Sequence, residues 1–87
     1  MLFEFDPAKS AANKTKHGID FVEAQGIWAD VDRLEIPARS AGEPRYQVVG
    51  RIGDKTWSAF ITYRNEEIRI ISVRRARKDE EARYLAD

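Results

Sequence analysis

The sequence contains no cysteine and a single histidine. Without a thiol, the chain can form no disulfide, no thiolate zinc site and no cysteine nucleophile, which favours a reducing, cytoplasmic location. The lone imidazole, His17, excludes a relay between two histidines. It also argues against a metal site, since no second imidazole or thiolate is present. We therefore expect a protein that uses no metal and no cofactor.

Long apolar runs, phosphate-binding glycine motifs and net charge are absent as well. No apolar stretch approaches the roughly 18 residues of a membrane span, and residues 1–6 lack the basic and long apolar regions of a signal peptide. We expect no association with membranes. No Walker loop or dinucleotide-binding glycine motif occurs. Fifteen Lys and Arg balance fifteen Asp and Glu, which argues against a protein that coats nucleic acid without specificity.

The length of 87 residues predicts one small domain over residues 1–87, because second cores rarely form below roughly 150 residues. Hydrophobic residues make up 43% of the chain, enough for a thin core. Domains of this size often depend on a partner for stability.

Charge is unevenly distributed along the chain. Residues 69–78 contain five cations and no acid, and residues 9–17 contain three lysines and His17 without an acid. Residues 20–43 contain six acids against two arginines. This segregation indicates a molecule with one side that faces anions.

The first part of the chain predicts a short strand and a helix. Residues 2–5 alternate and are rich in aromatic side chains, which is typical of an edge strand. Asp6 and Pro7 are typical of a helix start. We expect that helix to run to about Lys16, with Gly18 as its left-handed cap.

A second helix of about two turns is expected over residues 20–28. Asp20 and Glu23 have the spacing of a capping box, and apolar residues follow at helical spacing. We expect small side chains of the first helix to pack against aromatic side chains of the second. These residues are Ala11, Ala12, Phe21 and Trp28.

The second half of the chain predicts four strands and a final helix. A short strand over 34–36 ends at Pro37, and a polar loop over 38–44 follows. A helix is expected over 76–86, where Glu80 and Glu81 suit its N-terminus. Three longer strands are expected over 45–52, 56–63 and 68–73, with connections at 53–55 and 64–67. Connections this short imply an antiparallel meander, so we expect an α+β domain ordered strand, two helices, four strands, helix.

Arginines recur along the three longer strands. Alternation on each strand gives three sets that share a side, namely Arg45, Gln47, Val49 and Arg51; Ser58, Phe60, Thr62 and Arg64; and Ile68, Ile70, Ser72 and Arg74. If these sides coincide, several guanidinium groups lie at the rim of the sheet beside Tyr84.

Fixed guanidinium groups bind phosphate bidentately and can stabilise a phosphorane transition state, which suggests phosphodiester chemistry. The alternative is that these arginines are solvated strand ends, or that they dock an acidic partner.

His17 follows Lys16 and precedes the expected cap glycine. It should therefore project from the end of a helix. It can act as a lone acid or base there, or serve a structural role at the helix C-terminus. The spacing leaves both roles open.

Several segments together form a recognisable pattern. They are Phe5-Asp6-Pro7-Ala8-Lys9 with Asn13, Lys16-His17-Gly18-Ile19-Asp20-Phe21 leading to Ala24, Glu43-Pro44-Arg45 with Gly50, Ile68 to Ala76, and Glu80, Glu81, Arg83 and Tyr84. In these segments the chain resembles the BrnT family of type II toxins, which has a RelE-like fold. The resemblance spans nearly the whole chain, with departures at Phe5, where the family more often has Trp, and at Val73, where Ala is common.

The resemblance implies a toxin that inhibits translation by cutting RNA, free or on the ribosome, without a metal. It also implies a ribbon-helix-helix antitoxin (BrnA-like) that forms a hetero-oligomer with the toxin, through which operator DNA is bound. The 2′-hydroxyl of the substrate would attack the adjacent phosphate. The implied catalytic residues are Arg45, Arg64 and Arg74 at the phosphate, with Lys16, His17 and Tyr84 as candidates for proton transfer. The expected RNA-binding residues are Lys9, Arg51, Arg69, Arg75, Arg77 and Lys78.

A second class of function stays open. A non-catalytic module would use its basic face to dock an acidic antitoxin segment, and would take part in operator binding only through that complex. The same charge complementarity would let the antitoxin mask an RNA site, so we expect salt-sensitive association.

Overall fold

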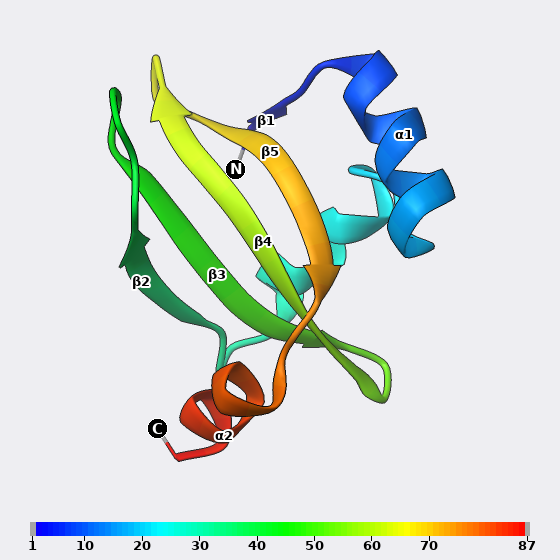
Figure 1. Ribbon diagram of the computed structural model, residues 1–87, viewed down its shortest axis with the longest axis vertical. Coiled ribbons are helices and arrows are strands. Elements are labelled where there is room, and N and C mark those ends of the chain that lie inside the picture. Colours follow the sequence, from blue (N-terminus) through cyan, green and yellow to red (C-terminus); the bar gives the residue numbers. More distant parts are fainter. Residues whose placement is uncertain (1, 87) are drawn as a thin grey trace.

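A computed structural model of the chain describes residues 2–86 (Figure 1). It is an α+β structure with one five-stranded sheet and three helices. The elements are β1 (Phe3–Glu4), α1 (Pro7–His17), the 3₁₀ helix η1 (Glu23–Ala29), β2 (Leu34–Ala38), β3 (Arg45–Ile52), β4 (Lys55–Arg64), β5 (Glu67–Arg75) and α2 (Lys78–Ala86). The predicted order of elements is confirmed. Among the residues described, no helix is both long enough and apolar enough to cross a membrane.

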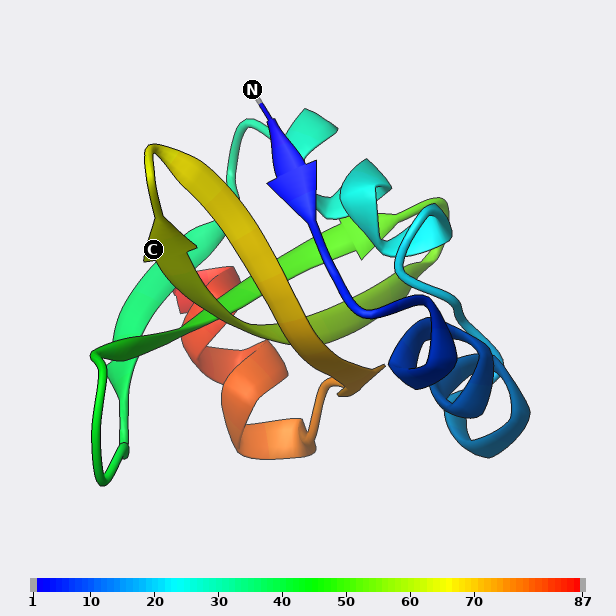
Figure 2. The same ribbon diagram turned by 90° about the horizontal axis from the view of Figure 1, so that it is seen from above.

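The sheet has the strand order β1-β5-β4-β3-β2. Strands β2 to β5 form the predicted antiparallel meander. Strand β1 adds to the β5 edge in parallel, with Phe3 opposite Ile68 (Figure 2). The turn between β4 and β5 has only two residues, Asn65 and Glu66, both with positive φ. This backbone matches the twist of the paired strands.

Strand β5 contains an irregularity that changes which residues share a face. Consecutive residues of β4 pair with Ile70 and Ser72, so Ile71 has no partner. An extra residue reverses the alternation of side chains. The expectation that these four residues of β5 share one side is therefore wrong. Ile68 and Ile70 face the core, whereas Ser72 and Arg74 face away from it.

The core lies between the sheet and η1. Gly50 on β3 permits the close approach, because a Cβ atom there would lie 2.8 Å from a methyl group of Ile27. The large, fully buried apolar side chains of this core include Phe21, Ile27, Val48, Ile61, Ile70 and Val73. Residues on η1 and on three adjacent strands thus form one cluster.

Helix α1 packs against β5 through polar side chains. Asn13 is buried, and its amide nitrogen donates to the carbonyl oxygens of Ile19 at 2.8 Å and Val73 at 2.9 Å. Its amide oxygen accepts the N–H of Val73 at 3.2 Å. Ser10 is also buried, and its hydroxyl accepts the N–H of Phe21 at 2.9 Å. These bonds join the helix, the following loop and the sheet.

The expected packing of Ala11 and Ala12 against aromatic residues is wrong. Both alanines are exposed, because the helix turns Ser10 and Asn13 inward instead. Trp28 packs edge to face against Phe3, with 5.0 Å between ring centres.

The second helix begins later than expected and has 3₁₀ geometry. The capping box is present, since Asp20 N–H donates to Glu23 Oε1 at 3.0 Å and Glu23 N–H donates to Asp20 Oδ1 at 2.7 Å. Gly26 in the middle of η1 lowers its α-helical propensity, and short connecting helices are often 3₁₀.

The limits of the other elements also differ slightly from expectation. Strand β2 continues through Pro37 to Ala38, because an edge strand tolerates a missing N–H. Helix α2 starts at Lys78, two residues later than expected.

Candidate functional site

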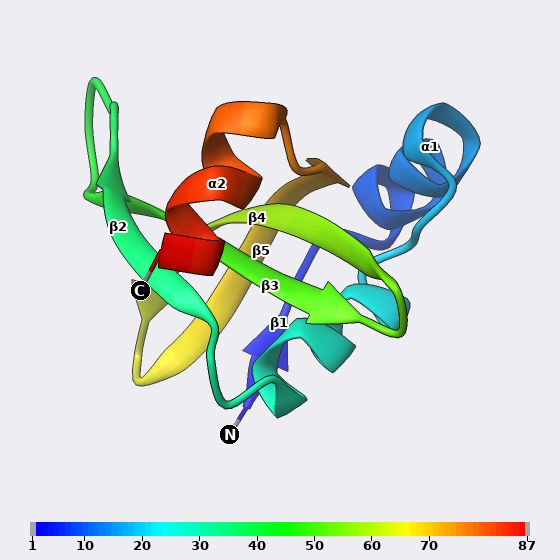
Figure 3. The same cartoon turned by 90° about the horizontal axis from the view of Figure 1, so that it is seen from below.

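Strand register places five arginines on the sheet face opposite η1. Val49 pairs with Ser58, which also pairs with Arg74, so the sides of β3 and β4 that carry Arg51 and Arg64 coincide with the side of β5 that carries Ser72 and Arg74. Helix α2 lies on this face, at one end of the strands (Figures 1 and 3). We call this surface the arginine face, and its arginines are Arg45, Arg51, Arg64, Arg69 and Arg74.

At the end covered by α2, the Glu80 carboxylate receives hydrogen bonds from four residues. The two Nη atoms of Arg74 donate to its two oxygens, each at 2.8 Å. Further donors are Gln47 Nε2 at 2.8 Å, Ser58 Oγ at 3.0 Å and the backbone N–H of Arg77 at 2.9 Å. We call Glu80, Arg74, Gln47 and Ser58 the helix-end cluster.

The helix-end cluster is largely removed from solvent, with side-chain exposures of 22% for Arg74 and 13% for Glu80. The hydrogen bonds from Arg74 are the main cause that lowers the pKa of Glu80 to about 2, against the opposing effect of burial. The Arg74 guanidinium also lies 5.2 Å from the centre of the Phe60 ring. The cluster therefore fixes the orientation of Arg74 and anchors α2 to the sheet.

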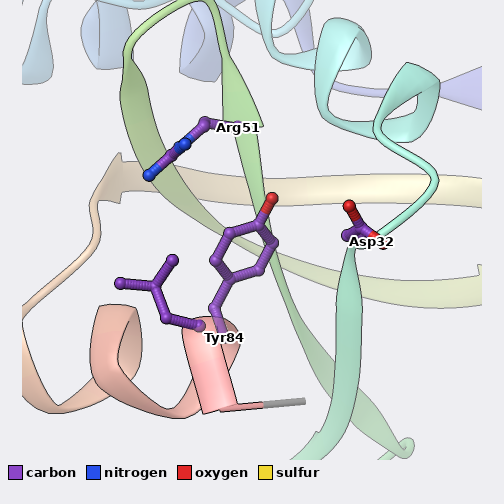
Figure 4. Close-up of a pocket in the computed structure, with 4 residues that line it drawn as sticks. Asp32, Arg51 and Tyr84 are labelled. Carbon is purple, nitrogen blue, oxygen red and sulfur yellow. The ribbon is translucent and has the colours of Figure 1, made fainter.

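A cavity of about 220 Å³ opens beside α2, lined by Asp32, Arg51, Tyr84 and Leu85. Figure 4 shows Tyr84 rising from α2 between Arg51 and Asp32. The Tyr84 hydroxyl donates to Asp30 Oδ2 at 2.5 Å. The Asp30 carboxylate also accepts the backbone N–H groups of Arg51 at 2.8 Å and Asp32 at 2.9 Å.

These bonds set the ionisation of both groups. Burial favours the neutral form of Asp30. The hydrogen bonds from Tyr84 and the two N–H groups outweigh this effect and lower the pKa of Asp30. The bond to Asp30 raises the pKa of Tyr84. Tyr84 therefore stays protonated at neutral pH, with its single O–H directed at Asp30. Within residues 2–86, no three His, Asp or Glu side chains gather closely enough to hold a metal ion.

At the opposite end of the arginine face, three arginines surround Glu43 in the loop between β2 and β3. Arg64 donates to its two oxygens through Nη2 at 3.0 Å and Nε at 3.3 Å. This bond chiefly lowers the pKa of Glu43, and the charges of Arg64, Arg45 and Arg69 add to the effect. Arg69 lies 3.5 Å from a carboxylate oxygen of Glu4. We call these five residues the loop-end cluster.

The expected catalytic arginines thus fall into two groups. Ser58, which lies opposite Arg74, is six residues from Arg64 along β4. At about 3.3 Å per residue, the backbones of Ser58 and Arg64 are roughly 20 Å apart. The structure therefore brings Arg45 and Arg64 together, but it does not bring Arg74 to the same phosphate.

Lys9, Lys16 and His17 lie on α1, beyond the β5 edge of the sheet. The three views keep α1 apart from α2 (Figures 1, 2 and 3). Within the described chain, no hydrogen bond or ion pair joins these two helices. Helix α1 ends at Gly18, whose φ is 80° and whose N–H donates to the carbonyl of Lys14 at 2.9 Å.

The basic segment 69–78 divides between the two faces of the sheet. Arg75 lies on the core side, with its guanidinium 5.4 Å from the centre of the Trp57 ring. Arg77 and Lys78 are exposed where α2 begins. This segment therefore does not form one continuous basic surface.

Sequence reasoning missed the acidic partners that organise both ends. Glu80 follows Arg77 by three residues and accepts its N–H, as its expected role at a helix start implies. Its bonds to Gln47 and Ser58, and the bond of Asp30 to Tyr84, span 22 to 54 residues. No local signal reveals such partners.

A family model described as "Ribonuclease toxin, BrnT, of type II toxin-antitoxin system" matches residues 5–80. The match includes all five arginines of the arginine face, together with Glu43 and Glu80. No curated protein matches the chain.

Proposed function

Because the chain belongs to this BrnT family of ribonuclease toxins, we propose that it cleaves RNA without a metal ion and thereby inhibits translation. One observation carries the proposal: five arginines and Tyr84 share the sheet face that η1 leaves open. Guanidinium groups there can bind successive phosphates of an RNA strand. We further propose that the meander, with helices on both sides, is a RelE-like arrangement.

In the proposed reaction, a ribose 2′-oxygen attacks the adjacent phosphorus while the bond to the 5′-oxygen of the next nucleotide breaks. The 2′-hydroxyl gives a proton to a base, and the leaving oxygen receives one. The products are a 2′,3′-cyclic phosphate and a 5′-hydroxyl. The protein needs to supply orientation, proton transfer and charge stabilisation.

We place the scissile phosphate at the cavity beside α2. The exposed Arg51, which lines the cavity, would stabilise the developing negative charge, whereas Arg74, paired with Glu80, would act by holding α2 in place. Tyr84 would turn its O–H from Asp30 to the leaving oxygen and deliver the proton there. This assignment rests on the cavity and on the hydrogen bonds that orient its lining.

Lys16 and His17 remain the candidates for the base that accepts the 2′-hydroxyl proton. Both lie beyond the β5 edge, so the RNA would have to cross that edge to reach them (Figure 1). Lys9, Arg75, Arg77 and Lys78 would contact RNA outside the arginine face.

We propose that a ribbon-helix-helix, BrnA-like antitoxin neutralises the toxin in the cytoplasm by covering the arginine face. Operator DNA would be bound only by the resulting hetero-oligomer. In support, three arginines of this face already hold the carboxylates Glu4, Glu43 and Glu80. An acidic antitoxin segment would find the same complementarity.

The binding of carboxylates by these arginines also supports a second, non-catalytic function. If the arginine face is built only to hold carboxylates, the protein is a non-catalytic module that docks an acidic antitoxin segment. The separation of Lys16 and His17 from Tyr84 also fits this alternative, since neither candidate base then lies beside the proposed acid.

Cleavage of total RNA in EDTA, with and without ribosomes, tests the proposal. The wild type should produce fragments with 2′,3′-cyclic phosphate ends. Arg51→Ala and Tyr84→Phe should each lower the rate by about 100-fold, because each removes one group that acts in the transition state. Both changes spare the helix-end cluster, whereas Arg74→Ala would disturb the fold. Lys55→Ala, which removes an exposed cation at the start of β4, is the matched control and should cleave like the wild type.

No cleavage under either condition would favour the docking module. Wild-type rates in both Arg51→Ala and Tyr84→Phe would place the reaction elsewhere on the molecule. His17→Gln and Lys16→Gln, measured in parallel, would show whether α1 supplies the base.

A further inference from the structure

The geometry points to a second anion site, separate from the proposed cleavage site. We propose that the loop-end cluster binds an RNA phosphate remote from the scissile bond, and that Glu43 occupies this site in the free protein. The inference rests on the proposed function in one respect, namely that the ligand is RNA.

The contacts of Glu43 are those that a phosphate would make. Its two oxygens are bound by Nη2 and Nε of Arg64, at 3.0 and 3.3 Å. Two donors of one guanidinium facing two oxygens is the geometry in which arginine binds phosphate. Arg45 and Arg69 are close enough for their charges to act on the same carboxylate. The site is therefore rich in cations around one small anion.

The Glu43 contact is exchangeable, because it is open to water. The Arg64 and Glu43 side chains are 48% and 38% exposed, and an ion pair in solvent contributes little to stability. The Glu43 carboxylate has no hydrogen-bond donor other than Arg64 within the described residues. An RNA phosphodiester likewise carries one negative charge on two non-bridging oxygens, so it can take the place of this carboxylate.

The loop allows Glu43 to leave while the arginines stay in place. Gly42 precedes it in open space, and the residue that follows is held to the sheet, since Thr62 Oγ1 donates to the carbonyl of Pro44 at 2.7 Å. The arginines lie on strands, outside the loop. Displacement of Glu43 thus needs only local movement.

The distance between the two ends sets the length of RNA required. The roughly 20 Å along β4 corresponds to about six stacked nucleotides at 3.4 Å each. Phe60 and Ser72 lie between the two ends on the same face and are only partly buried. A long oligonucleotide can therefore reach both ends, whereas a trinucleotide cannot.

The test is the affinity for a twelve-nucleotide RNA with 2′-O-methyl riboses, which cannot be cleaved, measured by fluorescence anisotropy over a range of salt concentrations. Glu43→Gln should lower the Kd several-fold and steepen the slope of log Kd against log salt by about 0.7, the value for one more phosphate contact on a single strand. Arg64→Ala should weaken binding and abolish the effect of Glu43→Gln in the double variant. A trinucleotide should show no effect of Glu43→Gln.

Glu66→Gln is the matched control. It removes the same charge two residues from Arg64, and Glu66 forms no ion pair in the described part of the chain. Its Kd should stay within about twofold of the wild-type value. An equal gain for Glu66→Gln and Glu43→Gln would overturn the inference, because net charge alone would explain it. Unchanged or weaker binding by Glu43→Gln, or no RNA binding by any variant, would also overturn it.

Cleavage of unmodified RNA, measured on the same preparations, separates this inference from the proposed function. Tighter binding by Glu43→Gln without any cleavage would support the phosphate site and contradict the nuclease. Cleavage by the wild type, with no change in RNA binding on Glu43→Gln, would support the nuclease and contradict the phosphate site.

Discussion

The two ends of the arginine face each contain an arginine that holds a glutamate through two nitrogens, yet the two pairs have different surroundings. At the helix end, both contacts measure 2.8 Å, and Arg74 and Glu80 are 22% and 13% exposed. At the loop end, the contacts measure 3.0 and 3.3 Å, and Arg64 and Glu43 are 48% and 38% exposed. The Glu80 carboxylate has three further donors, whereas the Glu43 carboxylate has none within the described residues.

The comparison shows that burial decides what an arginine and glutamate pair does. A buried pair cannot lose one partner without leaving a charge unsatisfied, so it anchors structure. An exposed pair can exchange its partner with water or with a ligand at little cost. Arg74 is therefore part of the fold, and Arg64 is available for binding.

Removing Glu80 should have the largest effect on stability of all the changes at the two ends. Glu80→Ala should lower the free energy of unfolding by about 3 kcal/mol, because it leaves Arg74 without its partner and takes an acceptor from Gln47 and Ser58. Urea unfolding at neutral pH measures the change. Glu81→Ala removes an acid at the next position of α2 and should have a small effect. Equal losses in the two variants would show that helix-end charge matters, and that the cluster does not.

Acid should weaken the helix end selectively. The pKa of Glu80 is lowered from 4.5 to about 2 in the folded protein. Its stabilising contribution is therefore complete above about pH 5 and is lost as the pH falls towards 2. Between pH 5 and pH 3 the wild type should lose roughly 2 kcal/mol more than Glu80→Gln, which cannot titrate there. Parallel pH profiles in urea unfolding would contradict this expectation.

The smallest effect on stability is expected at the loop end. Glu43→Gln and Arg64→Ala should leave the urea midpoint unchanged, because water replaces the lost partner in each case. The same two variants should change RNA affinity in opposite directions, so stability and binding separate at this end. A fall in midpoint as large as that of Glu80→Ala would show that burial is not what distinguishes the two pairs.

Much of the fold could be predicted because its signals are local. Asp6, Pro7 and Gly18 mark the limits of α1, and Asp20 with Glu23 marks the start of the next turn. Each signal is a hydrogen bond or a backbone angle set within a few residues. The short connections in the second half predicted the meander for the same reason.

The misassigned features depend on neighbours that are distant in the sequence. Asn13 is buried because Val73, sixty residues away, offers its backbone groups. Ile71 is an unpaired residue because of how β5 aligns with β4, and nothing in its own segment reveals this. The predictions about how α1 packs and about which β5 residues share a side were therefore wrong.

The sequence by itself determined the order of elements, the family and which strands carry arginines, since these depend on residue type and spacing along the chain. Only the tertiary structure decided that Arg74 is neutralised by Glu80, that Tyr84 is bound to Asp30, and that Arg64 lies at the other end of the face. Strand register and the position of α2 control burial. Burial in turn determines whether a charged side chain is held within the fold or is open to a ligand.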